Sequence, residues 1–177
     1  PNGSGGFIAG ASEMISAQAV SQATSYSIPV GEDLHGGTGN GTVNEPFRFV
    51  YLNLVAFVDN TAVTITSPAA GTVSFTLQRG QHYSTLSGDV VGPGVIPAAP
   101  GGLTVNAGTK LVTSQPIAGL IFTGGDGNFQ TRFYTMIPDL LHGSDYITTA
   151  PGDQTGLNGD LPLNLYIFNP DPVNAIT

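Results

Sequence analysis

The stretch Leu52–Thr66, LNLVAFVDNTAVTIT, decides the fold that the sequence predicts. A mostly apolar run reaches Phe57, a turn follows at Asp59-Asn60, and beyond the turn apolar residues alternate with threonine. Alternation with a period of two residues is typical of a strand that buries one face. The stretch therefore predicts two strands joined by a turn, which we interpret as a hairpin.

The end of the chain resembles this stretch. Residues 163–177 read LNLYIFNPDPVNAIT, and an offset of 111 residues gives six identities in fifteen aligned positions. A spacing of this size corresponds to about one β-domain. We therefore expect 163–177 to be the start of a second repeat, or an edge strand that pairs with a neighbouring subunit. A repeated module favours a surface or assembly protein over an enzyme.

Charge is scarce in this chain and mostly negative. Four basic residues stand against twelve acidic ones, the net charge is -8, and 9% of residues are charged, where about a quarter is usual. Nucleic-acid binding needs cations clustered against phosphates, so we exclude it. A neutral polar surface is common on secreted and cell-surface proteins. Such a surface also lowers the desolvation cost when protomers pack together.

Cysteine is absent, which excludes disulfides, thiol chemistry and zinc–cysteine sites. Secreted eukaryotic modules of this size often carry disulfides, so we expect an extracellular or cell-surface location in a prokaryote. The sequence contains no apolar stretch of about 18 residues, and we expect no membrane span. The 25 glycines and 13 prolines indicate many turns.

Turn-rich stretches divide the chain into three segments. We predict an N-terminal arm and linker loop over 1–46, because turn residues dominate 27–46. Residues 7–26 fit a helix and a strand about equally; we prefer an extended arm, which either folds back on its own domain or adds a strand to a neighbour's sheet. Short alternating runs over 47–162 predict an all-β, two-sheet antiparallel sandwich of about ten strands. The third segment is 163–177.

Residues 108–149 carry a recognisable pattern of turns and core positions. A glycine followed by a "v-T-S-x-x-P-v" strand pair is matched by Gly108, Val112, Thr113, Ser114 and Pro116. An "L-P-x-x-x-L-G-x-x-Y" element is matched by Ile137, Pro138, Gly143 and Tyr146. The pattern resembles the N-terminal domain of IgGFc-binding protein and its bacterial and archaeal surface relatives, over roughly residues 50–177. The resemblance implies a β-rich, often repeated extracellular module; immunoglobulin binding belongs to the animal member and to none of the matched residues.

Metal-binding candidates occur in loops and in one possible helical turn. Two glycine-rich loops offer oxygen ligands for calcium from Asp126, Asn128, Asp153 and Asp160. No EF-hand or nonapeptide pattern supports them, so calcium is the one cofactor we consider. Asp139, His142 and Asp145 are spaced by three residues and would share a face of a helical turn. The alternative is a solvated turn in which Asp139 accepts hydrogen bonds from backbone amides.

Signs of catalysis are absent from the sequence. Glu32, Asp33 and His35 resemble an acid–base set, but a glycine-rich loop does not hold catalytic groups rigidly. No GxSxG nucleophile motif occurs. We therefore expect no enzyme. Asn2 and Asn40 each begin a glycosylation sequon.

These patterns predict a non-enzymatic structural subunit of an extracellular filament, sheath or surface layer. It would self-assemble as a homo-oligomer or polymer through β-edge pairing and face packing. The alternative is a cell-surface adhesion module for glycans or a host protein. Adhesion predicts an exposed patch among the aromatic residues Tyr26, Tyr51, Tyr83, Phe129, Tyr134 and Tyr166.

Overall fold

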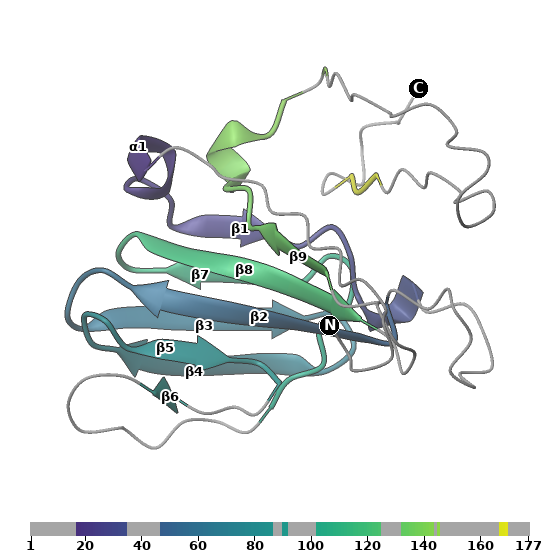
Figure 1. Ribbon diagram of the computed structural model, residues 1–177, viewed down its shortest axis with the longest axis horizontal. Coiled ribbons are helices and arrows are strands. Elements are labelled where there is room, and N and C mark those ends of the chain that lie inside the picture. The colour runs from purple at the N-terminus through teal and green to yellow at the C-terminus, as the bar shows by residue number, and fades with distance from the viewer. Residues whose placement is uncertain are drawn as a thin grey trace, which may run out of the picture.

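The computed structural model describes residues 17–34, 47–86, 90–91, 102–124, 132–143, 145 and 167–169. Within these ranges, nine strands form two sheets stacked as a sandwich (Figure 1). Every strand pair is antiparallel. The predicted all-β, two-sheet antiparallel sandwich is therefore confirmed.

The two sheets have different sizes. The four-stranded sheet contains, in spatial order, β1 (Ser25–Ser27), β7 (Lys110–Thr113), β3 (Thr61–Ser67) and β4 (Gly71–Leu77). The five-stranded sheet contains β6 (Val90–Val91), β5 (His82–Ser84), β2 (Phe49–Ala56), β8 (Ile117–Gly124) and β9 (Arg132–Thr135). The short helices are α1 (Ala17–Val20), η1 (Glu32–Leu34) and η2 (Asp139–Leu141).

The core lies between the two sheets and is built by the expected alternation. Val50, Leu52 and Leu54 of β2 are at most 2% exposed. Val63 and Ile65 of β3 are equally buried, at 1% and 0%. Successive side chains of a strand point to opposite faces, so these two strands turn their apolar faces toward one another.

The predicted hairpin over 52–66 is wrong, because β2 and β3 belong to different sheets. β2 pairs with β5 and β8, whereas β3 pairs with β4 and β7. The intervening residues cross from one sheet to the other, with Asn60 at a positive φ of 57° and the Thr61 hydroxyl donating to the Val58 carbonyl at 2.7 Å. Alternation shows which face of a strand is buried. It does not show which strand lies beside it.

The sandwich begins earlier than the predicted boundary at residue 47. β1 pairs with β7 in the register Tyr26↔Leu111, and Tyr26 and Ile28 are each 1% exposed. The Tyr26 hydroxyl donates a hydrogen bond to the buried carbonyl of Ile117. A three-residue strand among turn residues is too short for periodicity to reveal. Within 17–34 the chain therefore folds back onto its own domain, with a helical turn at α1 in place of the extended arm.

The C-terminal repeat lies almost wholly outside the described residues. Of 163–177, only 167–169 are described, and they form no strand. Phe168 is half-buried, and its ring lies 3.3 Å from the position that a Cβ on Gly108 would occupy. These residues therefore lie against the turn that precedes β7.

Candidate functional site

Four of the described strands form the borders of the two sheets, namely β1, β4, β6 and β9. A border strand carries unpaired backbone N–H and C=O groups and is a template for another chain, so soluble proteins usually protect it. β4 is the longest of the four, with seven residues, GTVSFTL, that include no charge and no proline. Within the described residues it pairs only with β3. We call its other side the β4 edge.

The remaining three borders are protected. β1 has three residues, and Tyr26 forms a further bridge to Pro138. β6 has two residues. β9 has four residues and begins with the charged Arg132. Short length, a covering segment and a charge are usual protections of a sheet border, and β4 has none of them.

The two faces of β4 differ in chemistry. Thr72, Ser74 and Thr76 are exposed on the outer face, where the Thr72 and Ser74 hydroxyls lie 3.1 Å from those of Thr66 and Thr64 on β3. On the inner face, Val73 and Phe75 pack against the core but remain only half-buried. The β4 edge is therefore bordered by a hydroxyl-rich face on one side and an incompletely covered apolar face on the other.

The sequence contained a signal for this edge. No charged residue occurs between Asp59 and Arg79, a run that covers both β3 and β4. The two charged residues that bound the run lie together, with the Arg79 amide donating to Asp59 Oδ1 at 2.9 Å. The chain carries few charges, and β4, the longest border strand in its described part, carries none.

The outer face of the five-stranded sheet carries four aromatic rings from neighbouring strands. The Tyr51 and Phe122 rings are 4.8 Å apart and nearly parallel, at 4°. The ring centroid of Phe49 lies 6.2 Å from that of Tyr51, and the ring centroid of Phe133 lies 5.8 Å from that of Phe122. Rings lying side by side in one plane cannot approach to 4.8 Å, so Tyr51 and Phe122 cover one face of each other. We call these four residues the aromatic ladder.

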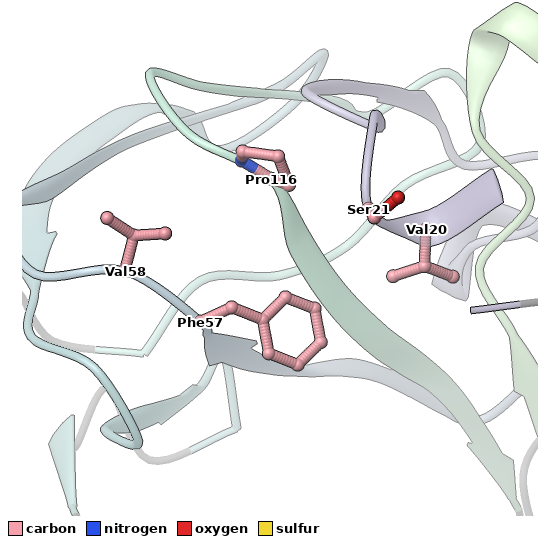
Figure 2. A pocket seen from close by; sticks show the side chains of 5 residues that line it. All are labelled: Val20, Ser21, Phe57, Val58 and Pro116. Carbon is pink, nitrogen blue, oxygen red and sulfur yellow. The ribbon is translucent and has the colours of Figure 1, made fainter. Parts of the chain in front are cut away.

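An apolar hollow of about 400 Å³ lies beside the connection between β2 and β3. Figure 2 shows its lining, which comprises Val20, Ser21, Phe57, Val58 and Pro116. The Ser21 hydroxyl already donates to the Gln18 carbonyl at 2.7 Å. Specific small-molecule sites combine apolar walls with a few polar groups that orient the ligand. The lining of this hollow offers no charge and no uncommitted polar side chain, so we assign it no ligand.

The acidic pair at η1 has a structural role. Asp33 Oδ1 accepts a hydrogen bond from the Ala107 amide at 2.8 Å, and Glu32 Oε1 accepts one from the Val50 amide at 3.3 Å. These carboxylates tie the N-terminal segment to the turn before β7 and to β2. His35, the third member of the predicted set, lies outside the described residues.

Asp139 joins η2 to the border strand β1. Asp139 Oδ2 accepts a hydrogen bond from the Ser25 hydroxyl at 2.5 Å and lies 3.6 Å from Lys110 Nζ. Burial raises the pKa of this carboxyl, but the hydroxyls of Ser25 and Ser27 and the charges of Lys110 and His142 outweigh that effect and lower the pKa below its ordinary value of 3.8. Asp139 is therefore an ionised anchor.

A metal site at Asp139 finds no support in this geometry. His142 Nδ1 lies 3.7 Å from Asp139 Oδ1, and these two side chains alone do not make a metal site. Among the described residues, no group of three or more His, Cys, Asp or Glu side chains gathers in a way that could hold a metal ion. Asp145 thus does not complete the predicted set of three ligands.

Replacement of Asp139 by asparagine is expected to lower the free energy of unfolding by about 1 kcal/mol at neutral pH. The folded-state pKa lies below the ordinary value, so the stabilisation by the carboxylate is complete above about pH 4 and is lost as the pH falls toward the folded-state pKa. Urea unfolding of both proteins at neutral and at acidic pH measures this. The two stabilities should converge in acid; a constant difference at every pH would contradict the role of the charge.

Several predicted site residues lie outside the described part of the chain. They are the calcium candidates Asp126, Asn128, Asp153 and Asp160 and the glycosylation candidates Asn2 and Asn40. These expectations stay predictions.

Of the six aromatic residues predicted for an adhesion surface, the four that the structure describes do not share one exposed patch. Tyr26 and Tyr83 are buried in the core, at 1% and 0% exposure. Tyr51 belongs to the aromatic ladder, and Tyr134, 37% exposed, lies on β9. Phe129 and Tyr166 lie outside the described residues. A sugar stacks on an open ring face, whereas Tyr51 and Phe122 cover each other.

The fold defines the chain as a two-sheet antiparallel β-sandwich with one unprotected border strand in its described part. No protein-family model, curated protein or solved structure matches the chain. The resemblance of residues 108–149 to the IgGFc-binding protein domain family stays a prediction. Helices in the described ranges have at most four residues, and none is long or apolar enough to cross a bilayer.

Proposed function

We propose that this chain is a non-enzymatic structural module of an extracellular assembly, such as a filament, sheath or surface layer. It assembles by pairing of sheet edges and packing of faces. The observation that carries the proposal is the β4 edge, which is long, uncharged and paired on one side only within the described residues. An extended segment that adds to such an edge gains main-chain hydrogen bonds, and the alternating side chains provide specificity.

The chemistry of the surface supports assembly at this edge. Desolvating charged groups is costly, and β4 contains none. The aromatic ladder adds a second, apolar contact surface on the opposite sheet. Three of the described acidic residues, Glu32, Asp33 and Asp139, hold loops and strands of the domain together. Their involvement in the fold supports a structural role rather than catalysis.

Blocking the β4 edge with charge tests the proposal. Replacement of Thr72 and Thr76 by lysine should weaken self-association by roughly tenfold or more, because lysine on a border strand disfavours pairing with another strand. Both positions are exposed on the outer face, so the fold should persist. Sedimentation velocity and light scattering over a wide concentration range measure the association, and circular dichroism checks the fold.

The matched control is Val112→Lys, which adds a lysine to the same outer face on β7, two strands from the β4 edge. Val112 is 51% exposed. This variant should associate like the unmodified chain. If the unmodified chain stays monomeric at every concentration, the proposed function is wrong.

A further inference from the structure

We propose that the partner at the β4 edge is a second copy of this chain, with the two β4 strands antiparallel about a two-fold axis at Ser74. The two four-stranded sheets would then form one continuous eight-stranded sheet. This inference rests on the proposed function and specifies its partner and register.

The sequence of β4 is self-complementary in this register. With Ser74 opposite Ser74 of the second copy, Thr72 lies opposite Thr76 of the second copy, and Val73 lies opposite its Phe75. Outer-face hydroxyl residues therefore meet hydroxyl residues, and inner-face apolar residues meet apolar residues. Directly opposite residues of an antiparallel pair share a face, and threonine pairs and pairs of an aromatic with a β-branched residue are favourable. A shift of the partner by one residue would place hydroxyl groups opposite apolar ones.

Charge restricts where two copies can meet. Each copy carries a net charge of -8, so their surfaces repel on average. The residues from Asn60 to Gln78 contain no charge, and the proposed register places Arg79 opposite Ala69 of the second copy. No like charges face each other along this line. The β4 edge is therefore a place where two acidic copies can approach closely.

The incomplete burial of the inner face favours the same arrangement. Val73 and Phe75 point toward the core yet remain half-buried, because no further strand covers them on the side away from β3 among the described residues. Phe75 contacts the buried Tyr83 ring at a centroid distance of 4.1 Å, so its position is held by the core. A second β4 would extend the apolar layer over both side chains and pair the free backbone groups.

Single cysteines test the register, because the chain has no cysteine of its own. Opposite residues of an antiparallel pair have Cα atoms about 4.5–5.5 Å apart, within the range of about 4.4–6.8 Å that a disulfide spans. Ser74→Cys should form a disulfide-linked dimer under mild oxidation, roughly tenfold faster than the control Val112→Cys, because association raises the effective concentration of the thiols.

A mixing experiment makes the test specific. Thr72→Cys alone should cross-link slowly, since its counterpart in the second copy would lie about 14 Å away along the strand. Thr76→Cys alone should behave likewise, for the same reason. A mixture of Thr72→Cys and Thr76→Cys should cross-link as readily as Ser74→Cys, because these two positions face each other.

Charge exchange provides a second readout that needs no oxidation. Ser74→Lys and Ser74→Asp should each weaken association, because each places like charges directly opposite one another. An equimolar mixture should restore it by forming the heterodimer. Sedimentation velocity compares the three samples.

The outcomes separate this inference from the proposed function. If the chain associates but neither cysteine cross-linking nor charge exchange shows the Ser74 register, the two-fold β4 pair is wrong and the assembly proposal survives. In that case another segment of a neighbouring copy would occupy the edge. If the chain does not associate at all, both proposals fall.

Discussion

Replacement of Tyr26 by alanine is expected to lower the free energy of unfolding by about 3–5 kcal/mol, the usual cost of removing a buried aromatic ring. Tyr26 is 1% exposed and lies on β1, opposite Leu111 of β7. Its hydroxyl donates to the carbonyl of Ile117 on the other sheet, so one side chain connects the border strand, the core and β8. Urea or guanidinium unfolding measures the loss.

Tyr26→Phe separates the hydrogen bond from the packing of the ring. It keeps the ring but leaves the buried carbonyl of Ile117 without this donor, which should cost about 1–3 kcal/mol. Tyr51→Phe is the matched control, because the Tyr51 hydroxyl makes no hydrogen bond within the described residues and its ring is only half-buried. If Tyr26→Phe is as stable as the unmodified chain, the hydroxyl makes no net contribution to stability.

Tyr26 also makes the stability of the fold depend on pH in the alkaline range. Burial raises the pKa of Tyr26 from its ordinary value of 10.0 to about 12. A group with a raised folded-state pKa contributes stability below its unfolded pKa, and this contribution is lost as the pH rises through the folded value. Stability should therefore fall between about pH 10 and 12. Tyr26→Phe should reduce this fall but not abolish it, because burial also raises the pKa values of Tyr51 and Tyr83.

Local alternation predicted the strands but not their arrangement. The inward positions of β2 and β3 follow directly from the order of apolar and polar residues. A hairpin and a crossing between sheets produce the same alternation, so the connection between these strands depends on β7 and β8, which lie far along the chain. β1 was missed because its three residues acquire a pattern only through contact with β7.

The β4 edge could be predicted only in part from the sequence. The absence of charge between Asp59 and Arg79 is a property of the sequence, and self-association was predicted from the scarcity of charge. That β4 lies at the border of its sheet is a property of the topology. The protection of β1 also depends on the topology, because its bridge to Pro138 cannot be inferred from the residues of β1 itself.

Replacement of Gly31 by alanine is expected to lower the free energy of unfolding by about 3–5 kcal/mol through backbone displacement. A Cβ at this position would lie 2.2 Å from the Ala107 nitrogen and 2.2 Å from the Asn106 carbonyl carbon. Both are main-chain atoms, so no side-chain rotation relieves the contact. The segment from 28 to 34 and the turn before β7 would have to separate.

Separation of these two segments would break three hydrogen bonds between them. The Glu32 amide donates to the Val105 carbonyl at 2.9 Å, the Gly108 amide donates to the Ile28 carbonyl at 2.8 Å, and Asp33 accepts from the Ala107 amide. These hydrogen bonds continue the β1–β7 pairing, so their loss should also weaken β1, the protected border of the four-stranded sheet. We therefore expect Gly31→Ala to unfold at lower urea concentration and to associate less specifically, because a loosened β1 exposes β7 as a second template.

Gly143→Ala is the matched control for this expectation, since the nearest atoms to an added Cβ there are 4.0 Å away. It should leave both the urea midpoint and the association unchanged. If Gly31→Ala unfolds at the same urea concentration as Gly143→Ala, the close approach of the two backbones does not hold β1 in place. In that case β1 would be a second weakly held border, and self-association could no longer be assigned to the β4 edge alone.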